Sequence, residues 1–137
     1  MKVRRVVTDH DEQGRAIVSA DEVCKGVSAR PGHERCDLWK APDGTVFRLV
    51  EYQPGVAPRN HRTETVDYAI LLSGECDLEL DDGKTVHMTQ GDIVVQRGTM
   101  HAWVNNGSAP CVFAFILIDA DPVEMGGRKL TTDYPTR

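Results

Sequence analysis

The sequence predicts a small all-β domain, either a closed barrel or a sandwich of short strands. Apolar and polar residues alternate over short segments such as 75–80, which gives each segment one buried and one wet face. Turn-forming pairs such as Ser73-Gly74 and Asp82-Gly83 separate these segments at short intervals. Helix-type spacing of apolar residues is nearly absent. Many short strands joined by glycine-containing turns are typical of barrels and sandwiches.

The strands are expected in a regular order along the chain. They are expected at residues 4–8, 16–19, 36–40, 46–52, 65–72, 75–80, 84–88, 92–96, 101–104 and 111–118. A loop is expected over 21–32, which contains two glycines and a proline. The tail, residues 121–137, is expected to be irregular or to form one helical turn.

Length and charge restrict the class of protein. A chain of 137 residues suits one domain, and 40% hydrophobic residues suffice for a real core. The formal net charge is −5, from 16 basic and 21 acidic residues. No basic face of the kind that phosphate backbones require is apparent, so we expect no nucleic-acid partner.

The four cysteines form no C-x-x-C pair, which argues against a zinc ribbon or a thioredoxin-type site. Cys76 and Cys111 lie in apolar strand patterns and are expected in the core. No signal peptide is visible in residues 1–8, and the apolar run 112–118 is too short to cross a bilayer. We therefore expect a reduced, cytoplasmic protein without a membrane partner.

Two segments contain the candidate functional residues. The first contains Gly55, His61, Thr63, Asp67 and Gly74, and the second contains Gly91, Gly98, His101 and Asn105. The spacing and order of both segments resemble the paired motifs of the cupin superfamily. The resemblance implies one small cupin domain over 1–137, a double-stranded β-helix or jelly-roll barrel. Its parts would be N-terminal strands and a loop (1–54), the barrel core (55–120) and the tail (121–137).

The resemblance also implies where a metal ion would lie. The usual motifs supply two histidines and a glutamate from the first segment and one histidine from the second. Here His61 and His101 match histidines, Thr63 stands at the second histidine, and Asp67 replaces the glutamate. The implied ligands are His61, Asp67 and His101, which would hold one divalent ion (Fe, Zn, Mn or Ni). The alternative is a site that holds no metal.

Strand geometry leads to the same three residues. Side chains two apart on a strand share a face, so His61, Thr63 and Asp67 point one way if that stretch is extended. Pairing this stretch with the strand that contains His101 would bring the two histidines and the carboxylate together. Asp67 lies in an apolar run, where an unpaired carboxylate is costly, and a histidine is its natural partner. The candidate catalytic residues are therefore His61, Asp67 and His101.

Other residues have weaker claims on the site. Thr63, Gln96 and Trp103 are assigned to the substrate pocket. Candidates for the pocket wall are Val46, Leu49, Ala69, Leu71, Trp103, Phe113 and Phe115. The basic stretch 59–62 could steer an anionic substrate to the barrel mouth. The remaining histidines, expected at the surface without partners, are His10, His33 and His87.

Two kinds of function fit these residues. The first is an enzyme acting on a small oxygenated molecule, either metal-assisted or by acid–base chemistry between the histidines and Asp67. Dehydration, isomerisation, decarboxylation and oxygenation all remain open. The residues within the two motifs resemble those of stand-alone cupins that accompany aromatic or polyketide metabolism. The second is a binding module that holds a small molecule without transforming it. The resemblance further implies a homodimer in which residues 4–19 contact the neighbouring chain.

Overall fold

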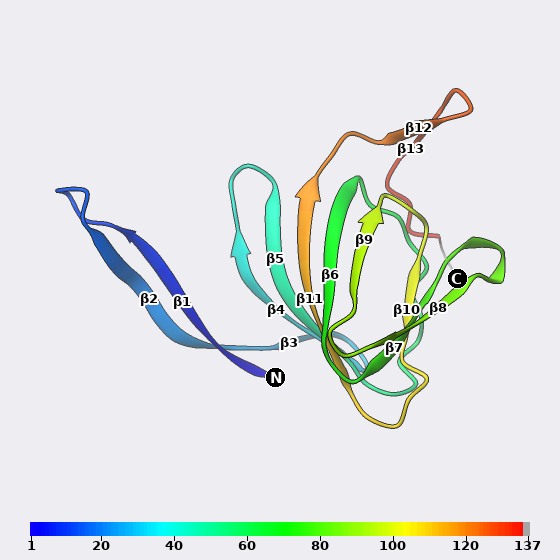
Figure 1. Ribbon diagram of the computed structural model, residues 1–137, viewed down its shortest axis with the longest axis horizontal. Coiled ribbons are helices and arrows are strands. Elements are labelled where there is room, and N and C mark those ends of the chain that lie inside the picture. The colour runs from blue at the N-terminus through cyan, green and yellow to red at the C-terminus, as the bar shows by residue number, and fades with distance from the viewer. Residues whose placement is uncertain (136–137) are drawn as a thin grey trace.

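The computed structural model describes residues 1–135 and confirms the all-β prediction (Figure 1). The strands are β1 (Lys2–His10), β2 (Ala16–Lys25), β3 (Val27–Arg30), β4 (His33–Lys40), β5 (Thr45–Tyr52), β6 (Thr65–Ser73), β7 (Glu75–Glu79), β8 (Thr85–Thr89), β9 (Ile93–Arg97), β10 (Ala102–Val104), β11 (Cys111–Asp119), β12 (Val123–Met125) and β13 (Arg128–Leu130). Within residues 1–135, one 3-10 turn (Asp81–Gly83) is the only helical element, and nothing helical there could traverse a bilayer.

Two sheets form the body of the molecule. The larger has the order β3-β4-β5-β11-β6-β9, and the smaller has the order β10-β7-β8. β6 and β7 are joined by Gly74, where the chain passes from one sheet to the other (Figure 1). Gly74 has a φ of 79°, and a Cβ there would lie 2.6 Å from the Pro110 carbonyl oxygen. Only glycine fits this crossing.

The main core lies between the two sheets. β11 presents Cys111, Phe113 and Phe115 to it on alternate positions, and β6 presents Ala69 and Leu71. Phe113 and Leu71 are fully buried, and each such side chain contributes roughly 1.5–3 kcal/mol of transfer free energy. Cys76 and Cys111 are buried here, as the sequence predicted.

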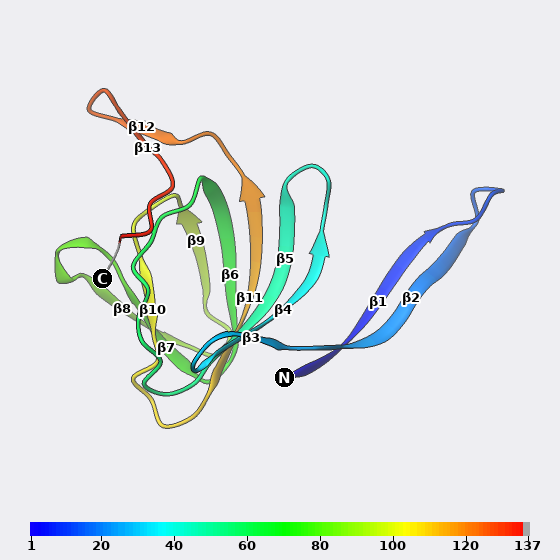
Figure 2. The same ribbon diagram turned by 180° about the vertical axis from the view of Figure 1, so that it is seen from behind.

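A smaller cluster covers part of the outer face of the large sheet. Cys36, Leu38, Leu49 and Ala114 form it, and Met1, Val3 and Cys24 pack against them. The first and last residues of the β1–β2 pair are thereby fixed to the barrel. The rest of this hairpin extends away from the body in both views (Figures 1 and 2).

The expected loop over 21–32 is wrong. β2 continues to Lys25, which pairs with Lys2, and β3 then pairs with β4 through Val27 and Arg35. The local turn signals in this stretch are outweighed by backbone pairing with residues distant in sequence. The strand propensity of a short segment does not reflect pairing with a distant part of the chain.

The expected irregular or helical tail is also wrong. β12 and β13 pair as a hairpin, and its turn is Gly126-Gly127, both in the left-handed region at φ 57° and 74°. Two consecutive residues with positive φ are what a tight hairpin turn requires. The final two residues of the tail, 136 and 137, lie outside the described part.

Asn105 fixes the loop between β10 and β11. Its side-chain nitrogen donates to the carbonyl oxygens of Tyr52 and Ala109, both at 2.9 Å, and its oxygen accepts from the Gly107 amide at 2.9 Å. The side chain is 1% exposed. The first bond ties the loop to the end of β5 and the other two hold the loop itself, so the matching position of the second motif is structural.

Replacing Asn105 with alanine is expected to lower the free energy of unfolding by about 1–3 kcal/mol, because buried polar groups lose their partners. Chemical denaturation measures the change. The matched control is Asn60→Ala, since Asn60 is exposed. Equal stability of N105A and N60A would contradict the structural role.

Candidate functional site

A cavity of about 210 Å³ lies against the inner face of the large sheet. β3, β4, β5, β6, β10 and β11 contribute to its wall, together with the segment before β6 and the tail. The lining residues are Ala29, Arg30, His33, Arg35, Arg48, Val50, Tyr52, Arg59, His61, Thr63, Asp67, His101, Trp103, Phe115, Leu117 and Tyr134. All three predicted catalytic residues are among them.

His61 and His101 face each other across an isolated β-bridge. Each backbone N–H donates to the other residue's carbonyl oxygen at 3.0 Å. The two imidazole centroids are 4.5 Å apart, with the planes inclined by 49°. The predicted pairing of the two motif segments is therefore correct at these two residues.

Both imidazoles are held by the same local contact. The Nδ1 atom of His61 lies 2.8 Å from the carbonyl oxygen of Arg59, and that of His101 lies 2.9 Å from the carbonyl oxygen of Thr99. A carbonyl only accepts, so Nδ1 carries the hydrogen in both rings. In the neutral ring Nε2 is then a proton acceptor.

His101 is 3% exposed, and burial lowers its pKa to about 4. The nearby His61 also lowers this pKa, while the hydrogen bond to Thr99 raises it. His101 is consequently uncharged at neutral pH, with an unprotonated Nε2. It is suited to accept a proton or to hold an electrophile.

Asp67 is buried, but its hydrogen-bond partner is not a histidine. Its Oδ1 accepts from the Thr65 hydroxyl at 2.6 Å, and that hydroxyl is 2.7 Å from the hydroxyl of Thr63. The expectation of a histidine partner is therefore wrong, because Thr65 precedes Asp67 by two residues on the same strand face and reaches it first. Burial raises the pKa of Asp67, while Thr65 and the charges of His61 and Arg48 act in the opposite direction.

The aromatic part of the wall is formed by Trp103 and Phe115. Their ring centroids are 5.6 Å apart, and Trp103 also meets the edge of His101 at 5.9 Å. Of the other predicted wall residues, Leu49 belongs to the outer cluster, whereas Ala69, Leu71 and Phe113 lie in the core without lining the cavity, and Val46 does not line it.

Gln96 does not line the cavity, although it is buried opposite Asp67 in the β6–β9 pair. Its amide nitrogen donates to the Thr99 hydroxyl. This contact turns Gln96 toward the segment that leads to His101. It is thus a neighbour of the site and not part of the pocket that the sequence predicted.

Tyr134 is a cavity residue that the sequence did not identify. The tail pairs with the segment before β6, through Asp133 and Arg62 at 2.8 and 2.9 Å, and thereby brings Tyr134 over His61. The two rings are stacked, 5.4 Å apart and inclined by 3°, and the Arg59 guanidinium lies 5.2 Å from the Tyr134 centroid. No sequence motif indicates a tyrosine of the tail as a site residue, so only the fold could show that Tyr134 lines the cavity.

His33 was expected at the surface and is instead part of the cavity wall. Burial, together with the charges of Arg30, Arg35 and Arg48, lowers its pKa to about 4. Within the predicted basic stretch 59–62, Arg59 lines the cavity, whereas Arg62 does not. The signal that could have indicated His33 is its position on the same strand face as Arg35.

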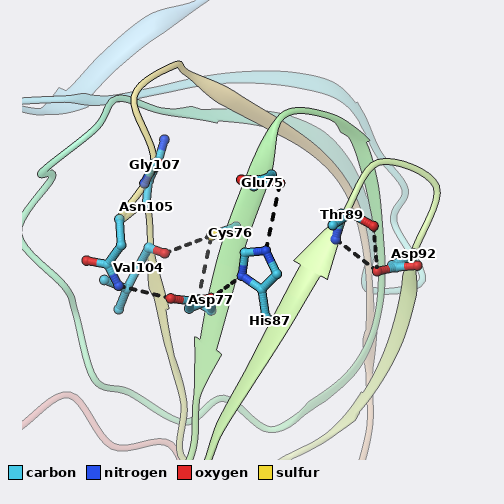
Figure 3. A network of polar contacts seen from close by, with 10 residues as sticks. Glu75, Cys76, Asp77, His87, Thr89, Asp92, Val104, Asn105 and Gly107 are labelled. Carbon is cyan, nitrogen blue, oxygen red and sulfur yellow. Dashed lines mark hydrogen bonds and ion pairs between the residues drawn. The ribbon is translucent and has the colours of Figure 1, made fainter.

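His87 is exposed, as expected, but it has partners (Figure 3). Its Nδ1 is 2.6 Å from Asp77 Oδ1, and Asp77 also accepts from the Asn106 side chain at 3.0 Å. Figure 3 shows Asp77 of β7 between β8 and the segment after β10. The hydrogen bond that His87 donates to Asp77 raises the pKa of His87. His10 is exposed on the β1–β2 hairpin.

The cupin-domain family profile matches residues 48–118, which include both histidines, Asp67 and most of the two sheets. The chain belongs to the cupin family. Cupins of known structure share this fold. The polyketide cyclase RemF from Streptomyces resistomycificus has a TM-score of 0.62 at 21% identity, covering 83% of this chain and 81% of that one. The cupin domain of Schizosaccharomyces pombe Cnp3 has a TM-score of 0.66 at 13% identity, covering 85% and 87%.

Fungal proteins are the more similar relatives in sequence. Oryzines biosynthesis cluster protein J of Aspergillus oryzae is 43% identical over 65% of this chain and 50% of its own length. Phomopsin biosynthesis cluster protein C' of Diaporthe leptostromiformis is 42% identical over 65% and 48%. The cupin-domain-containing oxidoreductase fogC of Aspergillus ruber is 40% identical over 64% and 45%. This cupin spans about half the length of these relatives.

Metal binding, which the family implies, is a poor fit to the donor set of this cupin. Across residues 1–135, no three or more His, Cys, Asp or Glu side chains are grouped so that they could hold a metal ion. His61 and His101 offer two imidazoles, but the Asp67 carboxylate does not group with them as a third ligand among the described residues. A threonine hydroxyl, at position 63, is a poor substitute for imidazole.

Elemental analysis of protein purified without chelators or a metal-binding tag is expected to find far less than one transition-metal ion per chain. Two imidazoles alone form an incomplete site. His61→Ala is expected to leave the metal content unchanged. Near-stoichiometric metal that disappears in H61A would contradict this assignment.

Proposed function

We propose that this cupin is an enzyme that moves protons on a small oxygenated organic molecule bound in the cavity. One observation carries the proposal: an uncharged imidazole and a hydroxyl chain to a buried carboxylate line the same cavity. The similarity to biosynthesis-cluster proteins and the fold of a polyketide cyclase support a small organic substrate. They do not assign the reaction.

His101 is the proposed general base. Its Nδ1 is held by the Thr99 carbonyl, so Nε2 keeps a lone pair in a fixed direction. With a pKa of about 4, the ring is unprotonated across the neutral range. A base with so low a pKa is weak, so it suits only substrates with an unusually acidic C–H, such as one between two carbonyl groups.

The chain of Asp67, Thr65 and Thr63 is the proposed acid. When Asp67 is ionised, Thr65 donates to it and Thr63 donates to Thr65, so the Thr63 oxygen only accepts from a ligand. When Asp67 is protonated, every bond reverses and Thr63 donates into the cavity. Burial favours the protonated form by raising the pKa of Asp67.

The two groups together complete an isomerisation without outside reagents. Nε2 of His101 takes a proton from carbon while Thr63 gives one to the carbonyl oxygen, which yields an enol. Thr65 and Asp67 replace the proton that Thr63 released. Return of the His101 proton to a different carbon, with the enol proton passing back along the chain, regenerates both groups.

Proton exchange in D2O is the direct test, and NMR follows the loss of C–H signals from small ketones and 1,3-dicarbonyls, phenylacetone and acetylacetone among them. His101→Ala is expected to slow enzyme-dependent exchange by about 10²-fold or more. Thr63→Val is expected to slow it while Thr63→Ser keeps it. His10→Ala, on the exposed hairpin, is the control and is expected to match the unmodified protein.

The outcomes of this experiment separate the candidate functions. Exchange at the same rate in H101A, or no exchange with any compound, would overturn the acid–base proposal. Binding of a compound without any change to it would favour a binding module. Oxygen consumption would favour the oxidoreductase activity named in several relatives.

We also propose that this cupin is a homodimer whose β1–β2 hairpin contacts the second copy. Val6, Val18 and Val23 of the hairpin are 50%, 61% and 57% exposed, and the hairpin stands away from its own barrel (Figures 1 and 2). Apolar strand surface of this kind favours burial against another chain.

Sedimentation equilibrium is expected to give a dimer at micromolar concentration. Val18→Lys together with Val23→Lys is expected to shift the mass toward a monomer, because two charges would enter the interface. Lys25→Val replaces an exposed charged residue of the hairpin with an apolar one and serves as the control. A monomer in the unmodified protein would remove the proposal.

A further inference from the structure

Four arginines line the cavity. Arg30 ends β3, Arg35 lies on β4, Arg48 lies on β5, and Arg59 precedes β6. They come from four separate stretches of the chain, so the cluster arises from the fold and not from a basic run in the sequence. Arg59 is also packed on the Tyr134 ring, which is itself stacked on His61.

The charge of this cavity is opposite to that of the whole chain. The chain has a formal net charge of −5, yet Asp67 is the only acidic residue among the lining residues that the structure describes. Asp37 is the cross-strand neighbour of Arg48, lies 2.9 Å from Arg48 Nε, and offsets part of one guanidinium charge. Even so, the lining cations outnumber the lining carboxylate.

The electrostatic effect extends along the cavity wall. Arg30, Arg35 and Arg48 all act to lower the pKa of His33, and Arg48 acts to lower the pKa of Asp67. Arg48 therefore influences both the His33 side and the Asp67 side. Its side chain is only 21% exposed, so solvent screens its charge incompletely.

The rest of the wall is apolar. Val50, Trp103, Phe115 and Leu117 provide flat hydrophobic surface beside the arginines. At about 210 Å³ the cavity is of a size that suits a small molecule. A ligand that satisfies both surfaces has a compact apolar body and an anionic group.

We propose that Arg35 and Arg48, on the neighbouring strands β4 and β5, form an anion subsite of the cavity and that the substrate is a small organic acid with a carboxylate or phosphate group. This rests on the proposed function, because it takes the same cavity as the substrate site. Guanidinium groups bind either anion through two parallel N–H···O bonds, which fixes orientation as well as charge. The anionic group then lies toward Arg35 and Arg48, and the reacting carbon lies toward His101.

Calorimetric titration with three probes of similar shape tests the subsite. Benzoate carries a carboxylate, phenyl phosphate carries a phosphate, and benzamide is the uncharged counterpart of benzoate. Benzoate or phenyl phosphate is expected to bind at least about tenfold more tightly than benzamide, as a charge-assisted pair provides. The anion that binds more tightly identifies the chemistry of the natural group.

Arg35→Gln and Arg48→Gln are expected to weaken binding of the preferred anion by about tenfold and to leave benzamide unchanged. Arg15→Gln is the matched control, because it removes the same charge from the exposed hairpin and is expected to have no effect. Arg35 is exposed, so R35Q tests the subsite even if R48Q, which loses the Asp37 contact, unfolds. Thermal melting verifies folding of each variant.

The results that would overturn the anion subsite differ from those that would overturn the proposed function. Equal binding of benzoate, phenyl phosphate and benzamide, no anion binding at millimolar concentration, or unchanged anion binding in folded R35Q would overturn the anion subsite. The proton-exchange experiment on H101A would be unaffected by any of these results. Conversely, selective anion binding that R35Q abolishes supports the subsite even if H101A and the unmodified protein exchange protons equally.

Discussion

The reciprocal backbone pairing of His61 with His101 is the contact on which the site depends. It joins the segment before β6, in the large sheet, to the start of β10, in the small sheet. The same contact places two imidazoles 4.5 Å apart, each fixed by a carbonyl two residues earlier in its own segment. Closure of the barrel and assembly of the proposed catalytic residues thus depend on the same contact. A substitution that opened this bridge would disturb both.

Burial affects the titratable groups of the cavity in different ways. It lowers the pKa of His101 to about 4 and raises that of Asp67, so that burial favours the uncharged form of each group. The arginines of the same cavity keep their charge, because a guanidinium is not deprotonated in proteins. One small space therefore holds an uncharged imidazole and a buried carboxyl group beside several guanidinium groups. Under the proposed function, the guanidinium groups orient the bound molecule, and the imidazole and the carboxyl group move its protons.

Much of the fold could be predicted from local sequence. Alternation of polar and apolar residues located β5, β6, β7 and β11 within a residue or two of their ends. The extended β2, the short β3 and the β12–β13 hairpin were missed, because their strand state depends on partners distant in sequence or on a glycine pair without a strong pattern. Likewise, Asp67 was expected to need a partner, but Thr65 rather than a histidine provides it.

The sequence by itself determined the fold class and identified the two histidines and the buried carboxylate of the site. Motif spacing and strand parity are local properties, so they can be read from the sequence alone. Only the tertiary structure decided what surrounds them. Four arginines from separate stretches, His33, and a tail tyrosine stacked on His61 converge on the cavity. Strand order and register, set by long-range hydrogen bonds, decide which side chains share an enclosed space. No pattern within a single segment contains that information.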